Sequence, residues 1–371
     1  MRRYDDADEE AVRTAMRVRD WKESGLLDAG RAEAIETDLR TRLKRTHWAL
    51  RAVLFFFTFS VLQSAAGFVY IIIGTPSNET VLAILALAAG LGCFWIADVL
   101  IARYGLYRFG VEEASAVCSI ALITGGMTLG ASMFEPGTNA LAVVALVTAS
   151  LTGGVVYWRF GLLYCALMAA ASVSAVAFFV GLSEIWSRLL AAGVLLGIHS
   201  VAGQLRQPFD DDYPGDDYGV IESAAWLGAY LLINLELTAL FTGPQPAVPP
   251  ALFWGTYAAV WFLPIIGLYR GLRRKHHWLI RANLLMLLGT LVTNKLYLGW
   301  ERHTWDPILL GLLLMAAALG VRRWLLSGLG GQRYGFTPHR LLSSDLQAMM
   351  QLSYMTAALK PDETVRETGG A

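Results

Sequence analysis

The chain has 371 residues, of which 55% are hydrophobic and 16% are charged. A soluble domain usually carries about 25% charged residues, so this composition is typical of a membrane protein. It excludes a disordered chain, a collagen, a coiled coil and a small disulfide-linked scaffold. Lys and Arg together number 30, as do Asp and Glu, and this balance gives no indication of a nucleic-acid partner.

Charge divides the chain into three parts. Residues 1–51 carry 23 charged side chains, whereas the 275 residues from 52 to 326 carry 29. We therefore expect a polar N-terminal segment at 1–48, a membrane domain at 49–326 and a polar tail at 327–371. The first apolar run begins near Ala52 and is long enough to cross a bilayer, so we expect an uncleaved anchor rather than a signal peptide.

Residues 8–24 show apolar side chains at helical spacing, and Gly25 follows where a helix end is expected. Asp28 can cap a second helix that carries Ala32 and Ile35 on one face. These features predict a short amphipathic helical hairpin. Its apolar faces could pack on each other, on the membrane surface or on a partner protein.

The turn of this hairpin has the sequence Trp21-Lys22-Glu23-Ser24-Gly25-Leu26-Leu27-Asp28. It resembles the domain-of-unknown-function 2157 family of predicted bacterial membrane proteins, which has a similar W-x-x-x-G-L-[LI]-D hairpin before its first span. The resemblance is best over 18–45 and extends loosely to about residue 130, through Tyr107-Arg108-Phe109-Gly110-Val111-Glu112-Glu113. It implies a bacterial inner-membrane protein without a known activity, and it carries over no functional residues.

Apolar runs of about 20 residues predict an all-α, polytopic membrane helix bundle of about ten spans. Short breaks with Gly, Pro, Asn or charge separate the runs. Asp306 is expected to cap the last span, with Pro307 at its first helical position. The predicted spans are 52–74, 80–102, 113–134, 138–158, 161–182, 185–203, 221–242, 251–270, 278–298 and 307–326.

The distribution of Lys and Arg predicts the orientation. With a cytoplasmic N-terminus, eight of these residues fall in inner loops and three in outer loops or outer helix ends. The positive-inside rule therefore predicts that both termini are cytoplasmic, which an even number of spans allows. The inner residues are Arg103, Arg108, Arg159, Arg206, Arg270, Arg273, Arg274 and Lys275, and the outer ones are Arg188, Lys295 and Arg302.

Polar residues inside spans are costly and are therefore candidates for function. Asn234 and Glu236 lie inside the outer end of the seventh span, and Asn294 and Lys295 lie toward the outer end of the ninth. We expect Glu236 to pair with Lys295. Such a pair could be structural, or it could form a proton- or cation-coupled site.

A second candidate set lies near the inner ends of three spans and consists of Asp98, His199 and Arg281. These side chains could meet at one level, or each could reach interfacial water. His276 and His277 follow a basic stretch, and we expect them to lie in a loop that touches anionic lipid headgroups.

Glycine pairs indicate where helices could approach closely. Gly126-x-x-x-Gly130 and Gly193-x-x-x-Gly197 have the required spacing. Apart from Pro264 in the eighth span, we expect no span to be interrupted as the broken helices of transporters are.

Familiar catalytic motifs are missing from the sequence. There is no H-E-x-x-H, no Walker loop, no G-x-S-x-G and no G-x-G-x-x-G after a strand. The three cysteines lie in apolar runs and have no metal-binding spacing. We therefore expect no metal, no cofactor and no enzymatic activity.

After the last span, a Gly-rich linker precedes a tail in which Ser343 or Ser344 can cap a helix that extends through Leu359. This helix has no Lys or Arg before Lys360, so we expect it to bind protein, for example the N-terminal hairpin, rather than an anionic membrane surface. The alternative is a frayed tail.

These features favour a non-catalytic interaction or sensing protein of the bacterial inner membrane, whose partners are the lipid bilayer and a protein bound at the hairpin or the tail helix. The alternative is a secondary transporter of a small solute with Glu236 as the coupling residue. A third hypothesis, an enzyme that acts on lipid, would depend on Asp98, His199 and Arg281 meeting.

Overall fold

The computed structural model describes residues 4, 6–23, 25, 27–39, 41–72, 79–206, 217–242, 248–300, 303–328, 333 and 336. In this part of the chain the regular secondary structure is helical, which confirms the predicted all-α fold class. The helices are α1 (Asp6–Glu23), α2 (Ala29–Asp38), α3 (Trp48–Ile72), α4 (Glu79–Tyr104), α5 (Val111–Ser132), α6 (Thr138–Phe160), α7 (Leu163–Ala175), the 3-10 helix η1 (Val176–Phe179), α8 (Glu184–Arg206), α9 (Asp217–Ile233), α10 (Leu235–Thr242), α11 (Pro250–Arg273), α12 (His277–Tyr297) and α13 (Asp306–Leu326).

Eight of the described helices are long and apolar enough to cross a bilayer, namely α3, α4, α5, α6, α8, α11, α12 and α13. The other two predicted spans are interrupted. Residues 161–182 form α7 and η1, and residues 221–242 divide into α9 and α10 at Asn234. The prediction of about ten spans therefore stays a prediction, because hydropathy records how apolar a segment is and not whether its backbone stays helical.

The two helix starts predicted from capping residues, at Asp28 and Asp306, are correct to within one residue. Asp28 is the N-cap of α2, although its side chain makes no capping hydrogen bond. In α13 the N-cap is Trp305, and Asp306 is the first helical residue. The Asp306 carboxylate instead accepts a hydrogen bond from the backbone N–H of His303, at 2.9 Å. It therefore still lies where a negative charge favours the helix N-terminus.

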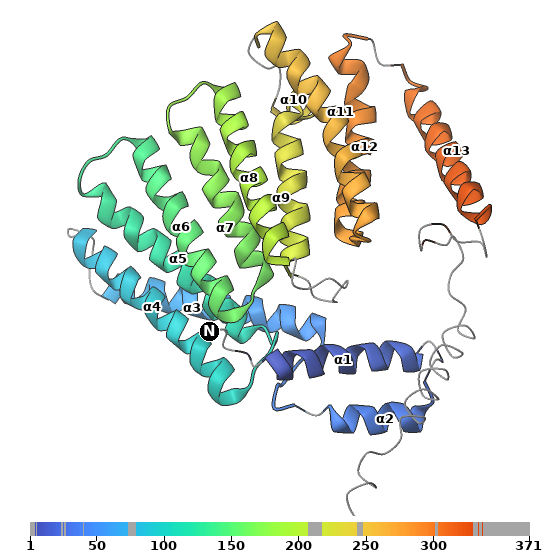
Figure 1. Ribbon diagram of the computed structural model, residues 1–371. Coiled ribbons are helices and arrows are strands. Elements are labelled where there is room, and N and C mark those ends of the chain that lie inside the picture. Colours follow the sequence, from blue (N-terminus) through green and yellow to red (C-terminus); the bar gives the residue numbers. More distant parts are fainter. Residues whose placement is uncertain are drawn as a thin grey trace, which may run out of the picture. The chain divides into compact units, whose positions relative to one another are not determined.

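The contacts of the described residues group them into two units, of which the first holds Tyr4 and helices α3 to α12. Within this unit, each helix from α4 to α9 packs against the next one along the chain (Figure 1). Helix α9 also packs against α12, which pairs with α11. Helix α3 packs mainly against α5.

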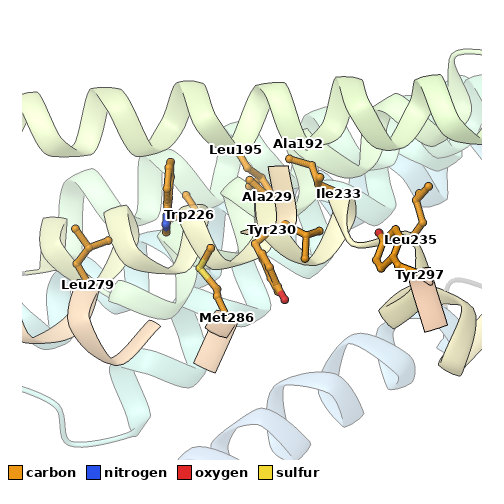
Figure 2. Close-up of a cluster of buried hydrophobic side chains, with 12 residues drawn as sticks. Ala192, Leu195, Trp226, Ala229, Tyr230, Ile233, Leu235, Leu279, Met286 and Tyr297 are labelled. Atoms are coloured by element: carbon orange, nitrogen blue, oxygen red, sulfur yellow. The ribbon is translucent and has the colours of Figure 1, made fainter. Parts of the chain in front are cut away.

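An apolar core joins α8, α9 and α12 (Figure 2). Ala192 and Leu195 of α8 face Ala229 and Ile233 of α9, and Met286 of α12 packs against another side of α9. Helix α9 is therefore enclosed by two neighbours, and the polar groups that it carries on these faces are hidden from lipid.

The predicted close helix contact at Gly126 is found between α5 and α4. A Cβ atom at Gly126 would lie 3.0 Å from the carbonyl oxygen of Ala83, and one at Gly130 would lie 3.9 Å from the Ala83 Cβ. The matching prediction for Gly193 and Gly197 is wrong, because a Cβ atom at either glycine would have no described neighbour within 4 Å. Small residues abound in spans, so their spacing alone does not identify a contact.

The second unit holds α1, α2 and α13 among its described residues. In the hairpin, Val18 and Ala32 are buried, and Trp21 and Ile35 pack against them. Gly25 follows α1 with a φ of 72°, a left-handed conformation that glycine adopts without strain. The hairpin is therefore formed as predicted, with the apolar faces of its helices packed on each other. The predicted tail helix at 343–359 lies outside the described residues.

An ion pair also joins the two hairpin helices. Arg19 donates a hydrogen bond to the Glu36 carboxylate at 3.0 Å, and the guanidinium lowers the pKa of Glu36. The stabilisation from this pair is present at neutral pH and is lost as the pH falls through that lowered pKa, because the carboxylate then loses its charge. The pair is open to solvent, so its contribution is small.

Replacing Gly126 with Ala is expected to destabilise the protein by about 1–3 kcal/mol, because the added methyl group forces α4 and α5 apart. The matched variant Gly193→Ala is expected to change stability by less than about 0.5 kcal/mol. The two can be compared through their thermal unfolding midpoints in one detergent. Equal midpoints would contradict the close contact seen between α4 and α5.

Candidate functional site

Asn234 marks a break in the helix at which α9 ends and α10 begins. Its side chain is fully buried, and its amide nitrogen donates hydrogen bonds to the hydroxyls of Tyr230 and Thr293, at 3.0 and 3.1 Å. Its side-chain oxygen accepts the backbone N–H of Leu237 at 3.0 Å. The interruption expected at Pro264 is not found, because α11 continues through that residue.

The backbone at this break is satisfied by a tyrosine of α12. The N–H of Leu235 donates to the Tyr297 hydroxyl at 2.8 Å. An unpaired N–H at membrane depth costs several kcal/mol, so a break of this kind persists only where side chains replace the lost helical bonds. Asn234 and Tyr297 provide that replacement.

No ion pair between Glu236 and Lys295 is recorded among the described residues, so their pairing stays a prediction. Asn294 accepts a hydrogen bond from the Tyr257 hydroxyl at 2.8 Å. The prediction assumed a continuous helix through 221–242, and the break at Asn234 changes the register of Glu236. Asn234 and Asn294 have side-chain hydrogen-bond partners on neighbouring helices.

The structure also separates the second predicted set. The Asp98 carboxylate pairs with Arg159 of α6 at 2.8 Å. Arg281 lies over the Trp278 ring, with 5.2 Å from its guanidinium carbon to the ring centroid. His199 stacks on Trp226, with ring centroids 4.7 Å apart. Each side chain therefore has a partner of its own, and the three do not meet.

A line of polar side chains runs along the contact between α9 and α12, which we call the polar seam. On the α9 side it consists of Glu222, Trp226, Tyr230 and Asn234, and on the α12 side it consists of His276, Asn283, Thr290, Thr293 and Tyr297. All nine residues are buried. The first four recur every four residues, so they share one face of α9.

Hydrogen bonds cross the polar seam at successive levels. Trp226 donates to Asn283 at 3.0 Å, and the hydroxyls of Tyr230 and Thr290 are 3.0 Å apart. Interhelical bonds of this kind contribute about 0.6–2 kcal/mol each in a membrane. The seam therefore fixes the register of α9 against α12.

Three glycines make room for these polar side chains. Gly203 of α8 faces Glu222, and a Cβ atom there would lie 3.1 Å from Glu222 Oε1. A Cβ atom at Gly289 would lie 2.9 Å from the Tyr230 hydroxyl, and one at Gly267 would overlap the Asn283 amide. The polar seam thus requires glycine at these three positions, because a larger residue there would crowd the polar side chain that it faces.

One end of the polar seam holds the ionisable pair Glu222–His276. Glu222 Oε2 lies 3.5 Å from His276 Nε2, and both side chains are at least 96% buried. The two ring nitrogens of His276 and Glu222 Oε2 make no hydrogen bond to any described residue. His199 lies next to the pair, with its Nδ1 3.0 Å from the Glu222 carbonyl oxygen. Such unsatisfied buried groups are unusual in native structures.

Further charges surround this pair. Arg206 of α8 is close enough to Glu222 to interact with it, and Arg270 and Arg274 at the end of α11 interact with His199. Asp217, at the start of α9, is also buried. The electric field at the pair therefore includes contributions from these arginines as well as from the Glu222 carboxylate.

Sequence patterns did not identify Glu222 or His276 as candidate site residues. His276 follows Arg273-Arg274-Lys275, and this context favoured a lipid-facing loop. In the structure the loop turns tightly at Lys275, which has a φ of 52°, and the N–H of His276 donates to the Gly271 carbonyl at 2.8 Å. This turn directs His276 into the protein. The signal that could have revealed it is the seven-residue spacing of His276, Asn283, Thr290 and Tyr297.

Within the described residues, no group of three or more His, Cys, Asp or Glu side chains is arranged to hold a metal ion. No family model matches the chain, and no curated protein or solved structure matches it. The resemblance to the domain-of-unknown-function 2157 family thus stays a prediction from the hairpin sequence.

Replacing Tyr297 with Phe is expected to destabilise the protein by about 1–3 kcal/mol, because it leaves the Leu235 N–H buried without a partner. Hydrogen exchange at the start of α10 should accelerate more than exchange in α6. Tyr269→Phe is the control, since Tyr269 is exposed on α11. If the Leu235 amide exchanges at the same rate in Tyr297→Phe and Tyr269→Phe, the Tyr297 hydroxyl does not stabilise the break.

Proposed function

We propose that this chain is a non-catalytic sensing protein of the bacterial inner membrane, with both termini in the cytoplasm, and that it responds to proton binding at the Glu222–His276 pair. The observation that carries this proposal is the burial of that pair, in which Glu222 Oε2 and both His276 ring nitrogens make no hydrogen bond to any described residue. The distribution of Lys and Arg supports the orientation, and the hairpin sequence supports a bacterial membrane protein.

A buried carboxylate next to an imidazole is well suited to bind a proton. Imidazole is the side chain that normally changes its charge between pH 5 and 8. Its protonation beside Glu222 turns a neutral ring and a carboxylate into an ion pair, and a charge change in a buried site is energetically large. The Glu222 carboxylate and the His276 ring are 3.5 Å apart, close enough to form such an ion pair.

In this proposal, the position of the pair couples proton binding to a conformational change. His276 immediately precedes α12, Glu222 lies in the first turns of α9, and His199 belongs to α8. A change of charge there alters the contacts of three helix ends at once. Lys275 adds strain beside it, because a non-glycine residue with a positive φ costs about 1–3 kcal/mol.

In this proposal the response is transmitted to a protein partner, and the hairpin is the candidate surface for it. The exposed faces of α1 and α2 are polar, because their buried apolar residues pack inside the hairpin. A charged surface of this kind favours recognition by complementary charges on another protein.

The proposal is tested by measuring unfolding midpoints of the reconstituted protein from pH 5 to pH 8. One linked proton changes stability by at most about 1.4 kcal/mol per pH unit. We expect His276→Gln and Glu222→Gln to remove a pH-dependent step that the wild type shows. His277→Gln is the matched control, and it should keep the step.

Equal pH profiles for His276→Gln, His277→Gln and the wild type would contradict proton binding at the pair. The proposal would also be contradicted if His199→Gln removed the pH-dependent step and His276→Gln kept it, because the proton would then bind to the neighbouring histidine.

The break at Asn234 favours the alternative function, a secondary transporter of a small solute. Discontinuous helices of transporters form substrate and ion sites where the backbone is interrupted. Glu236 follows the break by two residues and is the proposed coupling residue.

A screen of metabolites and ions for thermal stabilisation tests this alternative. A ligand at about 100 times its dissociation constant adds about 2.7 kcal/mol of stability. We expect a transported solute to stabilise the wild type and Glu135→Gln, whose side chain is exposed, but not Glu236→Gln. Stabilisation that survives in Glu236→Gln would exclude Glu236 as the coupling residue.

A further inference from the structure

Helices α3, α5 and α7 enclose a groove in the first unit that is distinct from the Glu222–His276 pair. Its volume is about 490 Å³. Trp48, Phe55 and Phe56 of α3 line one side, and Tyr164 and Met168 of α7 line another. Its walls are therefore largely apolar and aromatic.

One end of this groove is polar. Arg51 donates two hydrogen bonds to the Glu113 carboxylate, at 2.7 and 2.5 Å, which fix the plane of its guanidinium group. The Glu113 side chain is almost fully buried, whereas 34% of the Arg51 side chain stays exposed. Tyr164 also lines the groove and lies close enough to Arg51 to interact with it. Arg51 and Tyr164 thus offer donors at the polar end of an apolar groove.

The walls of the groove are open on the face that a bilayer would cover. Trp48 is 74% exposed and Phe56 is 66% exposed. Both belong to α3, an apolar helix that is long enough to span a membrane and whose apolar stretch contains no buried residue. At the depth of a membrane an open apolar groove of this kind is filled by hydrocarbon chains.

The charges around the polar end favour an anion. Arg42 and Lys44 are exposed in the six residues before α3, and Arg108 lies in the loop between α4 and α5. Lys44 is held there by backbone hydrogen bonds to that loop, including one to the Gly105 carbonyl at 2.7 Å. Arg42, Lys44 and Arg108 lie outside the lining of the groove, on segments next to the start of α3, where their positive charges attract an anion toward Arg51.

We propose that this groove binds an anionic phospholipid, with the phosphate at Arg51 and Tyr164 and an acyl chain along Phe55, Phe56 and Met168. Basic pockets between membrane helices on the cytoplasmic side bind lipid headgroups of this kind, and the predicted orientation places the start of α3 on that side. Glu113 holds the Arg51 guanidinium in place for the phosphate.

The test uses the purified full-length chain in nanodiscs of phosphatidylcholine that contain a small fraction of phosphatidylglycerol. Lipid that remains bound after transfer to detergent is measured by native mass spectrometry. We expect the wild type to retain phosphatidylglycerol at least five-fold more than phosphatidylcholine, relative to their proportions in the disc.

Two variants act on different parts of the groove. Ala52→Phe fills it from α3, and Ala65→Phe adds the same side chain to an exposed position of that helix outside the groove. Tyr164→Phe removes only the hydroxyl, and Tyr269→Phe is its control. We expect Ala52→Phe and Tyr164→Phe to lose the preference, and both controls to keep it.

Three outcomes would overturn the proposal. These are equal retention of the two lipids by the wild type, an unchanged preference in both groove variants, and a dimer mass that Ala52→Phe abolishes, which would make a second copy of the chain the occupant. Each is independent of the pH response, because none of the groove residues belongs to the polar seam.

Discussion

Polar groups inside a membrane protein must find partners within the protein, and the polar seam between α9 and α12 shows how this chain meets that constraint. Trp226 pairs with Asn283, and Tyr230 pairs with Thr290. A hydrophobic seam would allow α9 to slide against α12, because lipid tails are as apolar as leucine and give no preference for one register. Hydrogen bonds at fixed levels remove that freedom.

The same constraint explains two features that otherwise look unrelated. Gly267 faces Asn283 because a larger residue would displace the amide from Trp226. The helix can break at Asn234 because side chains of α12 and of Asn234 itself accept the freed N–H groups. The glycines and the break are therefore consequences of placing polar side chains in one line.

Composition and hydropathy predicted the fold class, the hairpin and the positions of the spans, because burial in lipid acts on every residue of a span at once. They did not predict the break, since the Leu235 N–H that it frees is bound by the hydroxyl of Tyr297, which lies 62 residues further along the chain. The pairing of Glu236 with Lys295 was inferred from depth alone, and depth does not determine which faces of two helices meet. Glu222 and His276 were missed for the same reason, because each looks like an ordinary residue near the end of a span.

The two ends of the polar seam differ in a way that bears on function. At the Tyr297 end the Asn234 amide and the freed N–H groups of Leu235 and Leu237 all take part in hydrogen bonds. At the Glu222–His276 end the ring nitrogens and one carboxylate oxygen have no described hydrogen-bond partner, although stability alone would favour apolar residues at such a position. A bound proton is the smallest ligand that changes the charge of this site without requiring a cavity. The asymmetry therefore favours the Glu222–His276 pair, rather than the Asn234 break, as the place where this protein responds to its surroundings.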